Sequence, residues 1–313
     1  MRKLNFILIL AIGLIFACDK IDDPIPSDLG NSISLGGDVE FISEPELALN
    51  DSAAIQNFIT NNIWDTTNGG DNSTRRFILL EEFTGHKCTS CPRGTREISR
   101  LKTIFGEQLI PIGIHTGFFA NPNAPGSFMY TTDFRILDDE NKDIGRAYTD
   151  AFTVSGNPRG IVNRVGIAKA ETQWEANINA VKDDAPDAVL RLANYYDSIN
   201  HVVRSQVEID WKKTSSDEYH IQLYVIEGKI IDWQLDGTFN DPNYEHKFVL
   251  RKIVNSTFGK ELKPAVEGES ENFQYIYKLD LNWKAKDAEV VAFIFNNDEN
   301  AYEVIQANSA YVK

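Results

Sequence analysis

The pattern of apolar and polar positions changes once along the chain, close to residue 186. Before it, two continuous apolar runs at 77–83 (FILLEEF) and 109–115 (LIPIGIH) are typical of strands covered on both faces. The stretch between them has apolar residues at helical spacing and lies between Pro92 and Gly106, a typical helix start and helix end. This β-α-β order predicts an α/β sheet. The further expected elements are a helix at 144–152, a strand at 160–165 and a helix at 174–181.

Beyond that point, apolar and polar residues alternate with a period of two, which is the pattern of half-buried strands. The alternation is found at 205–211, 221–225 and 275–283. Two more apolar runs, 290–295 and 302–307, flank an Asn-rich turn and predict a terminal hairpin. Strands at this spacing, without helices between them, favour an antiparallel, Ig-like β-sandwich. The predicted fold is therefore an α/β part followed by an all-β part.

The residues before the first buried strand form a less regular extension. One strand is expected within 39–49, followed by a short helix with Asp51 as its N-cap. The segment 65–74 (DTTNGGDNST) consists of turn-forming residues and is expected to be a loop.

The first residues have the features of an export signal. Arg2 and Lys3 precede an apolar run at 5–16 that is too short to span a membrane as a stable helix. The run ends in IFAC, which resembles a bacterial lipobox, so Cys18 is expected to carry a lipid and become the mature N-terminus. The alternative is an ordinary secretory signal with an incidental cysteine. Both interpretations place the mature chain outside the cytoplasm, where disulfides persist.

The stretch that follows, 18–38, is polar and contains Pro24 and Pro26, so it reads as a flexible tether. Its acidic cluster DKIDD resembles the surface-export signal of some Bacteroidetes lipoproteins, and a plain polar linker is the alternative. The lipid on Cys18 would anchor the protein to the outer membrane, with the periplasmic or the cell-surface face left open.

Length and charge limit the possible organisation and partners. With 313 residues, of which 42% are hydrophobic, the chain is long enough for two domains with real cores. The predicted divisions are a signal peptide at 1–17, a tether at 18–38, an extension at 39–74, an α/β domain at 75–185 and a β-sandwich domain at 186–313. The net charge of -15 argues against a nucleic-acid partner, because no basic field is present to replace phosphate counterions.

The candidate chemistry lies at the end of the first buried strand, where Cys88 and Cys91 form a Cys-x-x-Cys pair. A cysteine at a helix N-terminus is stabilised as a thiolate by unpaired N–H groups and the helix dipole. Cys91, one turn further in, is placed to resolve a mixed disulfide formed by Cys88. Lys87 is a further positive charge beside the first thiol.

This stretch resembles the thioredoxin fold, and the resemblance extends to two more residues. Glu82 stands six residues before Cys88, where thioredoxins have a buried acid, and the resemblance implies a proton-transfer role for it. An exposed strand carboxylate is the alternative. Pro158, in SGNPRG before a strand, matches the cis-proline loop that lies against the cysteine pair, with an ordinary trans turn as the alternative. His86-Lys87 and Thr89-Ser90 depart from the usual motif, so the direction of the reaction is open.

The lipobox, EEFTGHKCTSCP, IGIHTGFFANP, SGNPRGIVNR and the final VVAFIFNNDENAYEVIQA together resemble a Bacteroidetes lipoprotein family related to outer membrane protein (Omp) twenty-eight. The resemblance covers the chain from about Phe77 onward, and EEFTGHKCTSCP is its specific part. It implies an outer-membrane-associated lipoprotein, for which adhesion has been suggested.

Three functions remain open. The first is thiol–disulfide exchange with envelope proteins, catalysed by Cys88, Cys91, Glu82 and Pro158. The second is a binding or adhesin-like lipoprotein in which a Cys88–Cys91 disulfide is a structural clip. The third is copper or zinc handling by the cysteine pair with His86 or His115. A structural zinc site needs four ligands, covalent haem needs a histidine directly after the pair, and no bound cofactor is predicted.

Overall fold

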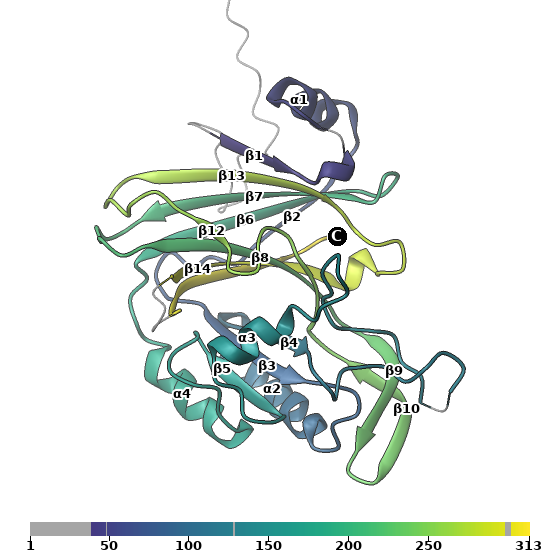
Figure 1. Cartoon of the computed structure of the whole chain (residues 1–313). Coiled ribbons are helices and arrows are strands. Elements are labelled where there is room, and N and C mark those ends of the chain that lie inside the picture. The colour runs from purple at the N-terminus through teal and green to yellow at the C-terminus, as the bar shows by residue number, and fades with distance from the viewer. Residues whose placement is uncertain (1–38, 48, 128, 298–301) are drawn as a thin grey trace, which may run out of the picture.

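A computed structural model of the chain describes residues 39–47, 49–127, 129–297 and 302–313 (Figure 1). The predicted signal peptide, Cys18 and the tether lie outside the described residues. The α-helices are α1 (Ser52–Asn61), α2 (Cys91–Phe105), α3 (Gly145–Ala151) and α4 (Trp174–Val181), with short 3-10 turns at Pro45–Leu47, Gly106–Gln108, Glu171–Gln173 and Ala285–Asp287.

The strands of the first half are β1 (Val39–Ser43), β2 (Asp65–Asn68), β3 (Ile78–Thr84), β4 (Leu109–His115) and β5 (Arg159–Val162). Those of the second half are β6 (Ala188–Asp197), β7 (Val202–Trp211), β8 (Tyr219–Glu227), β9 (Ile230–Asp236), β10 (Phe239–His246), β11 (Val249–Ile253), β12 (Lys260–Glu261), β13 (Ser270–Lys278), β14 (Ala288–Asn296) and β15 (Val304–Tyr311).

One mixed sheet runs through the molecule. Within the described residues it has eight strands, in the order β15-β14-β8-β11-β4-β3-β5, with β12 beside β8. β3 and β4 are parallel, and β5 runs antiparallel to β3 with Gly160 opposite Glu82. Helices α2 and α4 cover one face of this part through a cluster that includes Ile98 and Trp174, and α3 covers the other face through Tyr148 (Figure 1).

The α/β part and the later strands meet within this sheet. β11 pairs in parallel with β4 through Val249 and Gly113, and antiparallel with β8. The Gly113 N–H also donates to the Phe248 carbonyl at 2.6 Å. The fold is therefore mixed α/β and sheet-rich, and strands from both sides of residue 185 continue into one sheet. The limits of the predicted domains stay a prediction.

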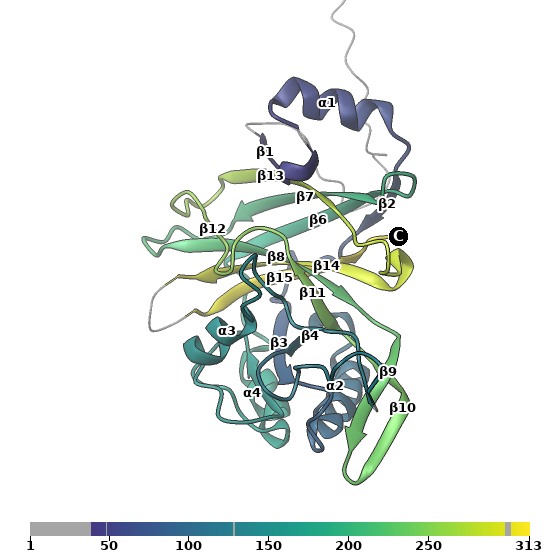
Figure 2. The same ribbon diagram turned by 45° about the vertical axis from the view of Figure 1, so that its right-hand side comes forward.

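A second sheet, in the order β1-β13-β7-β6-β2, packs over β8, β14 and β15 (Figures 1 and 2). Their facing sides share a core in which Val207 and Tyr275 from one sheet meet Leu223 and Val290 from the other. Alternating strands of this kind bury one face and leave the other to solvent or to further elements. Here α1 lies on the outer face of this sheet, where Ile55 packs with Val202 and Ile276.

Most predicted elements are confirmed. β4 and α4 have the predicted bounds, Asp51 caps α1 by accepting from Ala54 N at 2.7 Å, and the terminal hairpin is the antiparallel pair β14–β15. Two local predictions are wrong. The start of the expected loop 65–74 is β2, because residues 65–68 find a partner strand in β6. The alternation at 275–283 continues past the end of β13 at Lys278, after which Asp280 turns the chain by accepting from Asn282 N at 2.8 Å.

Candidate functional site

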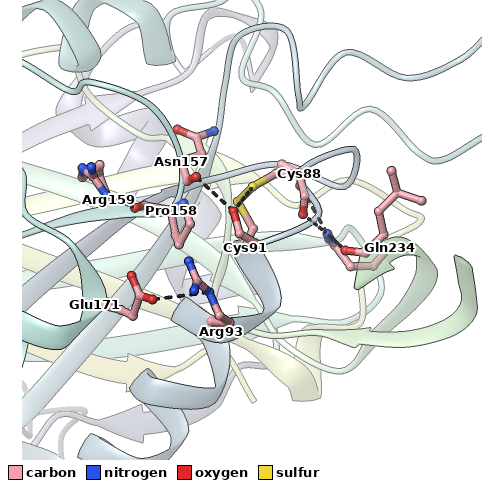
Figure 3. The surroundings of a disulfide bond; sticks show 11 residues. Cys88, Cys91, Arg93, Asn157, Pro158, Arg159, Glu171 and Gln234 are labelled. Atoms are coloured by element: carbon pink, nitrogen blue, oxygen red, sulfur yellow. Dashed lines mark hydrogen bonds and ion pairs between the residues drawn. A yellow bond between two sulfur atoms is a disulfide. The ribbon is translucent and has the colours of Figure 1, made fainter. Parts of the chain in front are cut away.

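Cys88 and Cys91 form a disulfide at the start of α2 (Figure 3). Their Cα atoms are 5.4 Å apart, and the turn that carries them is closed by Cys88 N donating to Gly85 O at 3.0 Å. Cys91 is the first residue of α2 and is followed by Pro92, as the sequence predicts. Only 3% of Cys88 and 1% of Cys91 is exposed, so the disulfide is covered.

Glu82 lies on β3 beneath the first turn of α2, with 3% of the residue exposed. Its Oε1 has no hydrogen-bond partner within the described part of the chain. Burial, followed by the charge of Glu171, raises the pKa of Glu82 to about 8. A thiol has an ordinary pKa near 8.5, so a carboxyl with this pKa exchanges protons with a thiol at little cost. The alternative of an exposed strand carboxylate is wrong.

Gly94 explains why Glu82 fits there. A Cβ at position 94 would overlap the Oε1 atom of Glu82 and would lie 3.2 Å from Cβ of Pro158. Gly94 is three residues after Cys91, and residues at that spacing share one face of a helix. Glu82 and Pro158 therefore lie on the same face of α2 as Cys91.

The peptide bond between Asn157 and Pro158 is cis, which confirms the predicted cis-proline loop. Ser90 connects this loop to the cysteines. Its Oγ donates to the Asn157 carbonyl at 3.3 Å and lies 3.6 Å from Cys88 Sγ. The hydroxyl is thus close enough to donate to a Cys88 thiolate when the disulfide is open.

A side chain from the second half of the chain reaches the same turn. Gln234, on β9, is 4% exposed, and its Nε2 donates to the Cys88 carbonyl at 3.1 Å and to the Gly85 carbonyl at 3.4 Å (Figure 3). The hairpin β9–β10 therefore forms one wall of the site.

The long connection 116–143 packs over the same end of β3. Lys87 N donates to the Phe119 carbonyl at 2.9 Å, and Thr131 Oγ1 lies 2.9 Å from His86 Nε2. His86 is 2% exposed, and burial, followed by the charges of His246 and Lys87, lowers its pKa to about 4. The ammonium of Lys87 lies 5.2 Å from the centre of the Phe118 ring.

The predicted metal ligands do not gather into a site. His115 is buried against Phe134 and His246, with ring centres 5.1 Å and 5.7 Å away. Over the residues that the structure describes, no three His, Cys, Asp or Glu side chains are placed to hold a metal ion.

Three residues of the site were not predicted. Gly94 inside a helix was a usable signal, because an interior glycine costs about 1 kcal/mol relative to alanine and therefore needs a packing reason. Ser90 was noted only as a departure from a motif. Gln234 gave no signal, because nothing in the sequence places residue 234 near residue 88.

Chemically, the site combines a disulfide at a helix N-terminus, a buried carboxyl on the Cys91 face and a cis-proline loop.

A sequence model of outer membrane protein Omp28 matches residues 145–313, more than half of the chain. The chain belongs to the Omp28 family, which confirms the predicted relationship and places the protein in the cell envelope. The cysteine motif at 88–91 precedes the matched residues.

Solved structures give a likeness in fold. HBP35 of Porphyromonas gingivalis is 16% identical, with a TM-score of 0.60 over 76% of this chain and 75% of that chain. A domain of the outer membrane lipoprotein Omp28 from Porphyromonas gingivalis is 17% identical over 40% of this chain and 84% of that chain. Its TM-score of 0.26 is too low to support an argument about fold. No curated protein matches the chain.

Among the helices of the described residues, none combines the length and the apolar character needed to cross a membrane.

Proposed function

We propose that the protein is an envelope thiol–disulfide exchange protein whose reactive pair is Cys88 and Cys91. The observation that carries the proposal is the position of Glu82. This buried carboxyl, whose Oε1 has no hydrogen-bond partner among the described residues, lies on the face of α2 that also holds Cys91. A purely structural disulfide needs no ionisable group beneath it, and burying one costs stability. The unit 75–185 is accordingly proposed to be thioredoxin-like.

In the reducing direction, the Cys88 thiolate attacks one sulfur of a partner disulfide, and the other partner sulfur leaves as a thiolate. Cys91 then loses its proton to Glu82 and attacks Cys88 Sγ, which releases the second partner sulfur. Two electrons pass from the cysteine pair to the partner, and the pair ends as the disulfide. The oxidising direction is the reverse, in which Glu82 returns the proton to Cys91.

The other parts of the site are proposed to stabilise the thiolate and to position the partner. The N-terminus of α2 and the Ser90 hydroxyl stabilise the Cys88 thiolate. The cis-Pro158 loop lies against the pair and is proposed to hold an incoming polypeptide. The lipid on Cys18 is proposed to anchor the protein to the outer membrane, with envelope proteins as substrates.

A second candidate function is binding, with the disulfide as a structural clip. The near-complete burial of both cysteines favours it. So does a surface cavity of about 1090 Å³ that lies away from the cysteines and is lined by residues such as Arg135, Arg251 and Trp283.

The reduction potential of the Cys88–Cys91 couple separates the two functions. Exchange requires a potential within the range of known redox proteins, about -120 to -270 mV, whereas structural disulfides lie below about -300 mV. Once the pair is reduced, Cys88 is expected to react first with a thiol-specific alkylator near neutral pH. Cys88→Ser is expected to abolish disulfide reduction in an insulin assay. A potential below the range, with no insulin reduction by the wild-type chain, would reject exchange and leave the binding function.

A further inference from the structure

Hairpin β9–β10 is fixed to the cysteine turn close to the hairpin tip. Leu235 N donates to the His86 carbonyl at 2.9 Å, and Gly237 N donates to the Thr89 carbonyl at 2.8 Å. The carboxylate of Asp236 pairs with Arg96 of α2 at 2.7 Å. Together with Gln234, these contacts bring the tip of the hairpin against the residues between the two cysteines.

The hairpin and the loop after β4 both present phenylalanines to solvent next to this turn. Phe239 directly follows the hairpin tip, pairs with Asp236 and is 62% exposed. Phe118 and Phe119, anchored to Lys87, are 73% and 39% exposed. We call these three residues the apolar rim. Exposed aromatic side chains on two segments that flank one turn are typical of an interaction site.

Two cations, Lys87 and Arg159, lie beside the cysteine turn, although the whole chain carries -15. The ammonium of Lys87 lies over the Phe118 ring, and the guanidinium of Arg159 donates to the Pro158 carbonyl. The carboxylates of Glu171 and Asp236 are already paired with Arg93 and Arg96. Asp241, opposite Gln234 in the hairpin, accepts from Asn243 N at 2.9 Å.

We propose that the apolar rim, together with Lys87 and Arg159, is a docking surface for a polypeptide segment that carries its reactive cysteine among apolar and acidic residues. The inference rests on the proposed exchange function and adds the chemistry of its partner. Because the hairpin closes one side of the disulfide, a partner thiol reaches Cys88 across the rim. A segment that buries the phenylalanines and places carboxylates near the cations gains binding energy there.

The test uses the full chain with Cys18→Ser, so that the pair at 88 and 91 holds its only cysteines. Reduction of its disulfide is timed with glutathione and with three short peptides that each contain one cysteine. The first peptide has leucine and aspartate around the cysteine, the second has lysine in place of aspartate, and the third has serine in place of leucine. Each rate is divided by the concentration of thiolate that the peptide or glutathione supplies at the pH of the assay.

The first peptide is expected to react fastest. Phe239→Ser and Phe118→Ser are expected to slow it about fivefold, since each removes apolar area that the peptide buries, while the glutathione rate stays the same. Ile199→Ser is the matched control, because Ile199 is 80% exposed and lies in the β6–β7 turn. Equal rates for the three peptides, or variants that slow glutathione equally, overturn the docking surface alone. If neither glutathione nor any peptide reduces the disulfide, the exchange function fails and the docking surface with it.

Discussion

Glu81 and Arg164 form an ion pair at 2.8 Å in which both side chains are fully buried. The second nitrogen of the guanidinium also donates to the other Glu81 oxygen at 2.8 Å and to the Tyr224 hydroxyl at 3.0 Å. The rings of Phe293 and Phe295 lie within 4.9 Å of its centre. The pair thus joins β3, the residues after β5 and the strands β8 and β14. Glu82, the neighbour of Glu81, points to the other face, where its Oε1 is left without a partner.

Removing only one partner of the Glu81–Arg164 pair should destabilise the fold. Arg164→Met is expected to lower the free energy of unfolding by about 3–5 kcal/mol, because Glu81 would remain as an uncompensated buried charge. Urea unfolding at neutral pH measures the loss. The double variant Glu81→Leu/Arg164→Met should recover much of the stability, since it leaves no charge behind. Lys142→Met breaks a pair with Glu140 that is 71% exposed on both sides and should change stability by less than about 1 kcal/mol. If Arg164→Met lost as little stability as Lys142→Met, the Glu81–Arg164 pair would not stabilise the contact between β3, β8 and β14.

Glu82→Gln should increase the stability of the fold and slow disulfide exchange. The folded pKa of Glu82 is about 8 against an ordinary 4.5, so ionisation of the carboxyl costs no folding free energy below pH 4.5. The cost grows as pH rises through the window from 4.5 to 8, because the unfolded chain ionises first. At about 1.4 kcal/mol per pKa unit, the variant should be more stable than wild type by several kcal/mol at pH 8.

The same variant should reduce insulin at least about tenfold more slowly, because it cannot accept the Cys91 proton. Glu107→Gln, an exposed carboxyl after α2, is the control and should alter neither property. A stability difference between Glu82→Gln and wild type that is the same at pH 5 and pH 8 would contradict the raised pKa.

Local patterns predicted the parts of the molecule that local physics determines. The apolar run of β4, the Pro92 start and Gly106 end of α2, and the Asp51 cap each depend on residues close in sequence. Part of the site could be predicted as well, because Glu82 and Pro158 lie beside α2, where the resemblance implied. Gln234 and the pairing of Val249 with Gly113 were missed, because strands of mixed polarity such as β9 and β10 carry no clear alternation and long-range pairing leaves no local signal.

Gly94→Ala separates helix propensity from the demands of the site. On an exposed helix face this change adds about 1 kcal/mol of stability. Here the new Cβ would overlap Glu82 Oε1, so the variant should unfold at a lower urea concentration and exchange disulfides more slowly. In a Glu82→Ala background the overlap with the carboxyl is gone and only the 3.2 Å contact with Pro158 Cβ is left, so Gly94→Ala should then cost less stability than it does in wild type. A stabilising effect in the wild-type background would show that the carboxyl does not occupy the space beneath the helix.

Acid should loosen the elements that cover the disulfide. His86, His115 and His246 are buried together between β3, β4 and β10, and burial, the largest cause for each, lowers their pKa values, to about 4 for His86 and His246. Between pH 6.5 and 4 these histidines therefore bind protons in the unfolded chain that they do not bind in the folded chain, so their contribution to the free energy of unfolding should fall as pH falls through that window.

Urea unfolding at several pH values measures this slope. His115→Phe keeps an aromatic ring against Phe134 and His246, and it should reduce the slope by removing one of the three titrating groups. His201→Gln, which alters a half-buried histidine outside the cluster, should leave the contribution of the cluster unchanged. A slope that is the same in His115→Phe as in wild type would mean that other groups account for the acid sensitivity.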